Sequence, residues 1–366
     1  MTEKITIIIP TYNESGNIES LLLNLVSFSS SFNLDILVID DDSPDGTSII
    51  VKSLASQYNC IRLIKRIGRS GLASAIKEGL LNASGDFALI IDGDGQHDIS
   101  SIPKVLNKIL NKKIDLIIGS RFHKDSTLKG LSESREVGSN MANYISRFSL
   151  SRAYSHLTDY MSGFFVVKIN SIQPFLRKID LNGFKFLYEL LAISHGKLIV
   201  EEVPLNFNER VYGNSKLDIA IFWDFFVSVL HSMSLRIIPR RALSFGLVGL
   251  SGVFIQLLIT SLLMNIFRLQ FIFALPISVI TSATSNYLIN NALTFRFQRL
   301  HGMSLIKGLL KFLLVASLPV IANVGLATAF YAYISTNTLM AQISGIVLVF
   351  VWNYAASSTF VWNSPK

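Results

Sequence analysis

The sequence has 366 residues, half of them hydrophobic, and its mean hydropathy is +0.45. A chain this apolar is not expected to be an ordinary soluble protein. Its formal net charge of +8 is spread unevenly, because no acidic residue follows Asp224 while six basic residues lie within 242–366. The excess positive charge therefore accompanies apolar segments, which indicates a membrane surface and argues against nucleic acid as a partner.

The cysteine content and the start of the chain bear on its compartment. Cys60 is the single cysteine, so an internal disulfide is excluded and a reducing compartment is favoured. The first residues lead directly into a strand-like run, and we therefore expect no signal peptide.

The first half of the chain alternates short apolar runs with helical patterns. Strands are predicted at residues 5–9, 35–40, 87–92 and 115–120, and helices at 17–27, 47–58 and 70–82. Continuous apolar strands joined by helices are typical of an α/β domain with a mostly parallel sheet. In such sheets the loops that leave the carboxyl ends of the strands form the ligand-binding crevice. The segments TYNES, DDSPDG, DGDGQH and SRFH all occupy that position.

The loop after the third of these strands is predicted to bind a metal ion. Asp92 and Asp94 flank Gly93, and Gln96 adds a neutral oxygen two residues further on. Two carboxylates on one turn can reach the same hard cation, and Mg²⁺ bound in this way keeps positions open for phosphate oxygens. A solvated turn is the alternative, but the position at a strand end favours the metal site.

A second acidic cluster, residues 40–46, follows another strand. Residues 43–46 are predicted to form a turn that Thr47 caps. Three aspartates before that turn exceed what a turn needs. One of them could accept hydrogen bonds from a nucleobase or from ribose hydroxyls.

Basic residues follow the acidic loops along the chain. They are Arg121, Arg135, Arg210 and Lys216. An arginine fork suits phosphate, although an exposed arginine is usually only solvated surface. Acids that bind metal and bases that bind phosphate, in a chain held at a membrane, suggest a phosphorylated donor and a lipid-borne acceptor.

The second half of the chain is predicted to cross the membrane. Spans are expected at about 245–267, 271–295, 309–333 and 340–362, each long enough for a bilayer, which needs about 20 residues. A buried helical core is disfavoured, because no acid occurs in these segments. Basic residues gather before the first span and between the second and third, so the preceding domain, that loop and the C-terminus are predicted to be cytoplasmic in a multi-pass protein of the cell membrane.

Two further patterns concern the organisation of the chain. Residues 217–235 mix aromatics with acids, and could form either an interfacial amphipathic helix or a helix packed on the preceding domain. The predicted division is therefore a catalytic domain at 1–216, interfacial helices at 217–241 and a membrane domain at 242–366. An offset of 67 residues aligns Asn286-Tyr287 with Asn353-Tyr354, which suggests a duplicated two-helix hairpin.

Several motifs in order carry a resemblance to a known family. They are PTYNE (10–14), DDDSPDGT (40–47), the DGDGQH loop, GSRF (119–122), SREVGSNMAN (134–143), DYMSGFF (159–165) and VPLNFNERVYGNSKL (203–217). Together they resemble the dolichyl-phosphate mannosyltransferases, GT-A glycosyltransferases of family 2, over about residues 3–220. Residues 242–362 resemble a GtrA-type membrane domain of four transmembrane helices, and the fusion of the two resembles the archaeal form of these enzymes.

The resemblance implies an activity and a set of site residues. The activity is transfer of mannose from GDP-mannose to dolichyl or another polyprenyl phosphate, with inversion, in the bilayer. The nucleoside would be held by Pro10, Tyr12, Glu14, Ile39 and Asp41. The metal, Mg²⁺ or Mn²⁺, would be bound by Asp92, Asp94 and Gln96, beside the Gly93 backbone.

The family pattern also implies residues for the two phosphate groups. Arg210 and Lys216 would contact the donor phosphates, while Arg121, Arg135 and Ser139 would bind the acceptor phosphate. Asp94, Arg121 and Arg135 are the residues expected to carry catalysis. The sequence departs from the pattern at Gly93, where the family often has alanine, and in lacking a tryptophan before the serine-arginine segment.

The chemistry of the acceptor limits the mechanism. A phosphate is already an anion, so no general base is needed to deprotonate it, and the enzyme must instead position it and neutralise charge. A polyprenyl-phosphate glucosyltransferase that uses a UDP-sugar remains an alternative, as does a transporter or flippase with a domain that binds sugar nucleotides. A processive synthase is disfavoured, because its aromatic acceptor motif is missing. The membrane domain could also assemble the protein into homo-oligomers.

Overall fold

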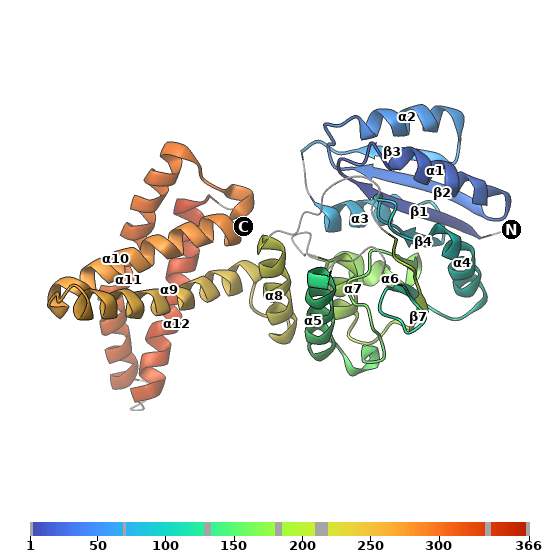
Figure 1. Ribbon diagram of the computed structural model, residues 1–366. Helices are drawn as coiled ribbons and strands as arrows, with labels where there is room; N and C mark the ends of the chain where they lie inside the picture. The colour runs from blue at the N-terminus through green and yellow to red at the C-terminus, as the bar shows by residue number, and fades with distance from the viewer. Residues whose placement is uncertain are drawn as a thin grey trace. The chain divides into compact units, whose positions relative to one another are not determined.

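The computed structural model describes residues 3–68, 71–127, 133–179, 185–208, 219–333 and 338–363; within these ranges the side chains of 133–135, 219, 221, 297 and 318–346 are not described. The chain forms two compact units, Met1–Met233 and Ser234–Lys366 (Figure 1). The boundary falls inside the segment 217–241 that was predicted to connect the two domains.

The first unit is built on one sheet, for which the described residues supply seven strands in the order β3-β2-β1-β4-β6-β5-β7. The strands are β1 (Lys4–Thr11), β2 (Asn33–Asp40), β3 (Ile61–Lys65), β4 (Phe87–Ile90), β5 (Leu116–Ser120), β6 (Phe165–Lys168) and β7 (Val200–Pro204). All neighbouring pairs are parallel except those made by β6. The predicted α/β fold with a mostly parallel sheet is thus confirmed.

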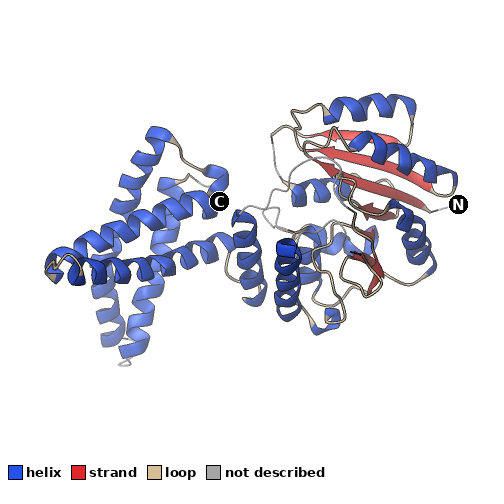
Figure 2. Ribbon diagram, in the orientation of Figure 1, coloured by secondary structure: helices blue, strands red, loops and turns tan. Residues whose placement is uncertain are grey.

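Helices cover the sheet (Figure 2). They are α1 (Ile18–Ser27), α2 (Thr47–Gln57), α3 (Leu72–Leu81), α4 (Ile102–Asn111), α5 (Glu133–Ser149), α6 (Ile169–Leu176), α7 (Phe186–Ser194) and α8 (Ile219–Met233). Alternate residues of each strand enter two separate apolar clusters. Ile8 and Ile90 belong to one with α3 and α7, whereas Ile7 and Leu89 belong to the other with α1, α2 and α4. Burial on both faces explains why the strands are continuous apolar runs.

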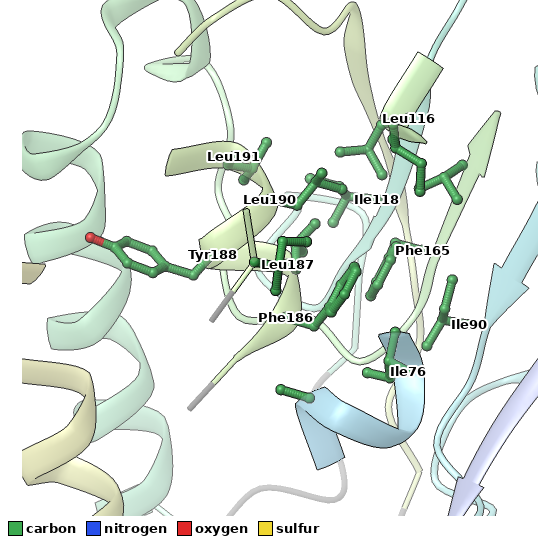
Figure 3. Packing of buried hydrophobic residues seen from close by; sticks show 14 of the residues in the cluster. Ile76, Ile90, Leu116, Ile118, Phe165, Phe186, Leu187, Tyr188, Leu190 and Leu191 are labelled. Atoms are coloured by element: carbon green, nitrogen blue, oxygen red, sulfur yellow. The ribbon is translucent and has the colours of Figure 1, made fainter. Parts of the chain in front are cut away.

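Figure 3 shows part of the apolar cluster that contains Ile90 of β4 and Phe186 of α7. Phe165 of β6 stacks on Phe186 of α7, with 6.1 Å between ring centroids and an interplanar angle of 7°. In the register of the sheet, Phe165 also pairs with Ile90 of β4 and Ile118 of β5. Because β6 runs antiparallel, its first residue lies at the carboxyl ends of its neighbours. The loop before β6 therefore reaches the same edge as the residues after β4 and β5.

Helix α8 packs on the first unit. Phe225 and Val229 are buried in its core, and the Phe225 ring lies 5.9 Å from that of Tyr188 in α7. Of the two alternatives for residues 217–235, the structure thus shows a helix packed on the preceding domain.

The second unit is helical. It contains α9 (Arg240–Asn265), α10 (Phe271–Ile289), α11 (Gly302–Tyr333) and α12 (Thr338–Ala356). Within the described residues, Arg240–Asn265 and Phe271–Thr294 are long and apolar enough to cross a bilayer. The spans predicted at 309–333 and 340–362 include many undescribed side chains and stay predictions.

The sequence repeat corresponds to a structural repeat within the second unit. Short π-helical turns follow α10 at Asn290–Thr294 and α12 at Ser357–Val361, 67 residues apart. Two aromatic contacts follow the same offset, which relates Phe245 to Phe312 and Tyr287 to Tyr354. The ring of Phe245 lies 5.7 Å from that of Tyr354, and the ring of Phe312 lies 5.6 Å from that of Tyr287. This agreement supports a duplicated hairpin whose halves pack around each other.

Candidate active site

A pocket of about 270 Å³ opens at the carboxyl ends of β1, β2 and β4. Its lining comprises Pro10, Thr11, Tyr12, Glu14, Asp41, Gly71, Leu72, Ala75, Asp92, Gly93 and Asp94. Every residue predicted for the nucleoside except Ile39 lines this pocket. The Ile39 side chain is fully buried in the sheet, so any role for it in binding would fall to its backbone.

The aspartates of the acidic cluster after β2 have different contacts. Asp40 is fully buried, and accepts hydrogen bonds from the Thr11 hydroxyl at 3.2 Å and the Ser43 N–H at 3.1 Å. Asp45 accepts from Thr47 at the start of α2, and these bonds hold its pKa below the ordinary value although burial raises it. Asp41 is the member of this cluster that lines the pocket.

Asp41 is held in place by an arginine that the sequence analysis did not identify. Arg66 Nη2 lies 2.6 Å from Asp41 Oδ1, and the Gly71 N–H donates to Asp41 Oδ2 at 2.8 Å. Both members of this ion pair are buried, and a buried pair fixes geometry more reliably than it adds stability. The Asp41 carboxylate therefore has a fixed orientation on the pocket wall.

The predicted metal residues lie together directly after β4. The Asp92 side chain is 31% exposed, which leaves it accessible from the pocket, whereas Asp94 and Gln96 are buried. Asp94 Oδ1 accepts the Gln96 N–H at 3.1 Å. Gln96 Nε2 donates to the Asn208 carbonyl at 3.1 Å, which leaves Oε1 as the Gln96 atom that could bind a cation.

This donor set fits a hard divalent cation. In the part of the chain that the structure describes, no group of three or more His, Cys, Asp or Glu residues is placed to hold a metal. Asp92 and Asp94 line the pocket, and Gln96 is buried two residues further along the chain. Two carboxylates and a carboxamide oxygen suit Mg²⁺ or Mn²⁺ that takes further ligands from a bound diphosphate.

Gly163 and His97 pack against Asp92 and limit its position. Gly163 lies so close that a Cβ atom there would overlap the Asp92 carboxylate. His97 Nδ1 accepts the Asp92 N–H at 3.4 Å, and its Nε2 lies 3.8 Å from Asp92 Oδ2. Burial lowers the pKa of His97 against the opposing effect of Asp92 and Asp94, so the imidazole is neutral. The sequence left His97 without a role, and the structure makes it a support for Asp92.

The departure at Gly93 has a local physical reason. The Cβ of an alanine at this position would lie 3.0 Å from Thr11 Cγ2 and 3.5 Å from the Pro10 carbonyl oxygen. Thr11 would have to move to accept it. Glycine at position 93 thus leaves room for the branched side chain of Thr11.

On the other side of Asp92, Arg121 follows β5 and binds a buried carboxylate. Its Nε donates to Asp159 Oδ2 at 2.7 Å and its Nη2 donates to Oδ1 at 3.0 Å. Asp159 is fully buried; burial raises its pKa, but the Arg121 guanidinium and backbone hydrogen bonds outweigh burial and lower it overall. Because the pair is bidentate, Arg121 has one defined direction.

The loop that carries Asp159 is itself braced. The Glu202 carboxylate of β7 accepts the Thr158 N–H at 2.8 Å and the Asp159 N–H at 3.0 Å. Asn143 of α5 accepts the Tyr160 N–H at 3.0 Å. Strand β7 and helix α5 therefore both fix the position of Asp159, and through it that of Arg121.

Lys185, at the amino end of α7, is a further charged residue that the sequence analysis missed. It precedes Phe186, which stacks beside the first residue of β6, and its charge interacts with those of Asp92, Asp94, Asp159 and Arg121. Burial lowers the pKa of Lys185 despite these acids. A single lysine between Phe184 and Phe186 gives no local signal of a functional role, and only the tertiary fold brings it here.

The remaining predicted residues are described in part or not at all. Ser139 is half-buried on α5, the helix that also carries Arg135, whose side chain is not described. Arg210 and Lys216 lie outside the described residues. Asp159 and Gly163 were visible in the sequence as part of the DYMSGFF motif but received no role. A lone acid within an apolar segment was the signal available.

The site has two parts that meet at Asp92. One part is the pocket, whose lining includes aspartates and glycines and suits a metal-bound nucleotide. The other part is Arg121, which follows β5 and is oriented by Asp159. Two family profiles match separate regions of the chain. The family profile described as Glycosyl transferase family 2 matches residues 6–172, and the profile described as GtrA/DPMS, transmembrane domain matches residues 244–362.

Full-length similarity decides the family. The chain is 32% identical over 361 residues to a protein named dolichol-phosphate mannosyltransferase from Pyrococcus furiosus, which covers 98% of this chain and 99% of that relative. The chain belongs to the dolichol-phosphate mannosyltransferase family. It is a glycosyltransferase with a membrane region of the GtrA type.

Other members and structures extend the comparison. A dolichol-phosphate mannosyltransferase from Mycosarcoma maydis is 30% identical over 71% of this chain and 87% of its own length. A structure of glucosyl-3-phosphoglycerate synthase from Mycobacterium tuberculosis with Mn²⁺, uridine diphosphate and glucosyl-3-phosphoglycerate covers 63% of this chain and 80% of that chain, at a TM-score of 0.47 and 18% identity.

Proposed function

We propose that this member of the dolichol-phosphate mannosyltransferase family transfers mannose from GDP-mannose to dolichyl or another polyprenyl phosphate, with inversion at the anomeric carbon. The supporting observation is the position of Asp92. Its carboxylate lines the pocket and also touches Gly163, in the loop whose Asp159 binds Arg121. A sugar bound to a diphosphate in the pocket would therefore end beside the arginine.

On the donor side, the pocket residues have separate tasks in this proposal. Asp41, oriented by Arg66, accepts hydrogen bonds from the nucleobase, while Pro10, Tyr12 and Glu14 enclose the nucleoside. Asp92, Asp94 and Gln96 would hold Mg²⁺ or Mn²⁺, and Arg210 and Lys216 would contact the diphosphate. When bound, a divalent cation supplies positive charge to the leaving diphosphate.

On the acceptor side, the site has to bind the anionic phosphate of the acceptor and leave its attacking oxygen accessible to the sugar. The Arg121 guanidinium is oriented by its pair with Asp159, and Lys185 is a second basic residue that interacts electrostatically with Asp92. Arg135 and Ser139 of α5 complete the acceptor phosphate site in this proposal. Because the phosphate oxygen is already an anion, the residues orient it and stabilise charge, and none is required to remove a proton.

The membrane unit explains how the acceptor reaches this site. A polyprenyl phosphate stays in the bilayer, so the catalytic unit has to work at the membrane surface. We propose that the second unit crosses the membrane several times with the catalytic unit and the C-terminus in the cytoplasm. The basic residues before α9 and between α10 and α11 support this orientation.

The metal assignment is tested by a pair of matched variants. Asp94→Asn removes one charge from the pocket, and Asp42→Asn removes one from an exposed aspartate in the loop after β2. Asp42 has a φ of 60°, which asparagine accepts, so the control substitution introduces no backbone strain. Transfer from labelled GDP-mannose is measured in liposomes that contain polyprenyl phosphate, over a series of Mg²⁺ and Mn²⁺ concentrations.

We expect Asp94→Asn to lower kcat about 1,000-fold, as removal of a group that stabilises the transition state commonly does. Asp42→Asn should keep the wild-type rate and metal dependence. Transfer by Asp94→Asn at the wild-type rate and with the wild-type metal requirement would show that the assignment is wrong.

A further inference from the structure

Helix α5 has a row of polar residues on the side that packs against its own unit. Ser139 and Asn143 are four residues apart, so they lie one above the other on the same face of the helix, and Arg135 precedes them by the same interval. Asn143 is buried, with an exposed fraction of 7%, and Ser139 is half-buried. Buried polar side chains are costly without hydrogen-bond partners, so this row raises the question of what its members bind.

Asn143 has a partner at one end of its carboxamide. Oδ1 accepts the Tyr160 N–H at 3.0 Å. This bond fixes the orientation of the amide, because a carboxamide turned over would direct its own N–H groups at the Tyr160 N–H. Nδ2 is buried and has no hydrogen-bond partner among the residues that the structure describes. A buried donor of this kind destabilises a protein, and a bound ligand is one reason to keep it.

The surroundings of this nitrogen indicate which ligand it meets. Tyr160 follows Asp159, whose carboxylate binds Arg121, so the Asn143 carboxamide lies against the loop that orients Arg121. Side chains of a helix lean toward its amino end, which directs Asn143 toward the turn that carries Ser139. Four residues correspond to a rise of about 6 Å along a helix. One phosphate group with hydrogen bonds on two sides can span that distance.

We propose that Asn143 is a further residue of the acceptor phosphate site. Its Nδ2 donates a hydrogen bond to a phosphate oxygen while its Oδ1 keeps the Tyr160 N–H. The inference rests on the proposed function and deepens it, because it adds a neutral donor to a site assigned to Arg121, Arg135 and Ser139. Hydrogen bonds to a charged acceptor are shorter and stronger than those between neutral groups, so a single amide contributes substantially to affinity.

Two substitutions with the same change of charge test the proposal. Asn143→Asp keeps an oxygen that can accept the Tyr160 N–H, and replaces the donor by a carboxylate oxygen that repels phosphate. Asn140→Asp is the matched control, because it makes the same substitution at an exposed position of the same helix. Asn143→Ala removes the donor without adding charge, so it tests the same contact where Asn143→Asp does not fold.

Binding is measured without the sugar donor. The full chain in detergent is titrated with citronellyl phosphate, a short isoprenoid phosphate, and the rise of its thermal unfolding midpoint is followed; citronellol serves as the ligand control without phosphate. We expect Asn143→Asp to need about 30-fold more citronellyl phosphate than wild type for the same rise, and Asn143→Ala about tenfold more, as loss of a hydrogen bond to a charged group commonly requires. Asn140→Asp should respond like wild type.

Two results of this titration would overturn the proposal. A wild-type response of Asn143→Asp and Asn143→Ala would show that Nδ2 meets only water. Equal weakening by Asn140→Asp would show that any added negative charge on α5 has the same effect, whatever its position.

Transfer kinetics in liposomes then assign the phosphate to the acceptor. Asn143→Asp should raise the KM for polyprenyl phosphate about 30-fold and leave the KM for GDP-mannose unchanged. A rise in the KM for GDP-mannose alone would put the amide at the donor diphosphate and contradict the proposal. The titration needs no turnover, so the two proposals can fail separately. A wild type that responds to citronellyl phosphate in the way predicted but transfers no mannose would contradict the reaction and support the phosphate site, whereas a wild type without any response would contradict the site.

Discussion

The two sides of the catalytic centre are organised in opposite ways. On the donor side, Asp92 has its carboxylate open to the pocket, and the structure fixes its backbone rather than its charge. On the acceptor side, Arg121 is already bound in a bidentate pair by the buried Asp159. In the proposed reaction, this difference means that the site around Asp92 would gain positive charge when the metal and the donor bind, whereas the charge of Arg121 is oriented by the fold beforehand.

Of the substitutions that test this comparison between the two sides, the largest effect is expected from breaking the Arg121–Asp159 pair. Asp159→Asn leaves Arg121 with no charged partner in a buried position, which commonly costs about 3–5 kcal/mol. We expect a kcat lower by about 100-fold, because Arg121 loses its direction, and a clearly lower midpoint of thermal unfolding. Steady-state transfer kinetics and thermal unfolding in detergent measure the two effects.

A matched control separates loss of orientation from loss of stability. Asp115, just before β5, accepts hydrogen bonds from Ser171 and the Ile199 N–H at the opposite end of the strand from Arg121. Asp115→Asn should lower stability and leave kcat per folded molecule unchanged. Equal losses of kcat in the two variants would refute a special role for the Arg121–Asp159 pair.

A smaller effect is expected on the donor side. Gly163→Ala introduces a methyl group that overlaps the Asp92 carboxylate, so Asp92 has to turn away from its present position. We expect metal affinity, measured as the Mn²⁺ concentration for half-maximal transfer, to weaken about tenfold, an effect typical of changes beside metal ligands.

The control is glycine in a place with room for a side chain. A Cβ at Gly138 would meet only the Phe222 ring, at ordinary contact distance. Gly138→Ala should leave the metal dependence unchanged and stabilise α5 slightly. If Gly163→Ala also keeps the wild-type metal dependence, the packing of Asp92 against Gly163 has no part in metal binding.

The smallest effect concerns pH. Burial raises the pKa of Glu202 above its ordinary value of 4.5, against hydrogen bonds from Asp159 and Thr158 that lower it. A raised folded-state pKa means that Glu202 contributes stability below pH 4.5 and loses it as the pH rises through the folded-state value. Glutamine does not titrate, so the melting temperature of Glu202→Gln minus that of wild type should increase by about 2–4 °C between pH 4.5 and pH 7. An unchanged difference across this range would contradict the shift.

Local patterns were enough to predict much of the fold. β-branched runs gave β1, β2, β4 and β5 to within a few residues, because strands buried on both faces have a distinctive composition. Strand β6 was not predicted, because it has only four residues, and nothing in those residues shows that the strand runs antiparallel to its neighbours. Its consequence was missed as well, namely that the loop with Asp159 and Gly163 reaches the edge of the sheet beside Asp92.

The site shows the same limit. Asp92 and Asp94 were predicted as metal ligands because two acids directly after a strand are conspicuous in the sequence, and this assignment stays a prediction. Arg66 and Lys185 were missed, because each depends on a partner distant in the sequence or on burial that the sequence does not display. His97 was interpreted only as a structural residue, and its contact with Asp92 became visible in the structure. The resemblance to a family supplied the roles of Arg210 and Lys216, which stay predictions.

The most direct measurement is transfer of labelled sugar to polyprenyl phosphate in liposomes by the wild-type protein, with GDP-mannose and UDP-glucose compared at equal concentration. The proposed function predicts a lipid-linked mannose product from GDP-mannose, inverted at the anomeric carbon, and little product from UDP-glucose. Absence of lipid-linked mannose, or preferential transfer from UDP-glucose, would contradict the proposed reaction.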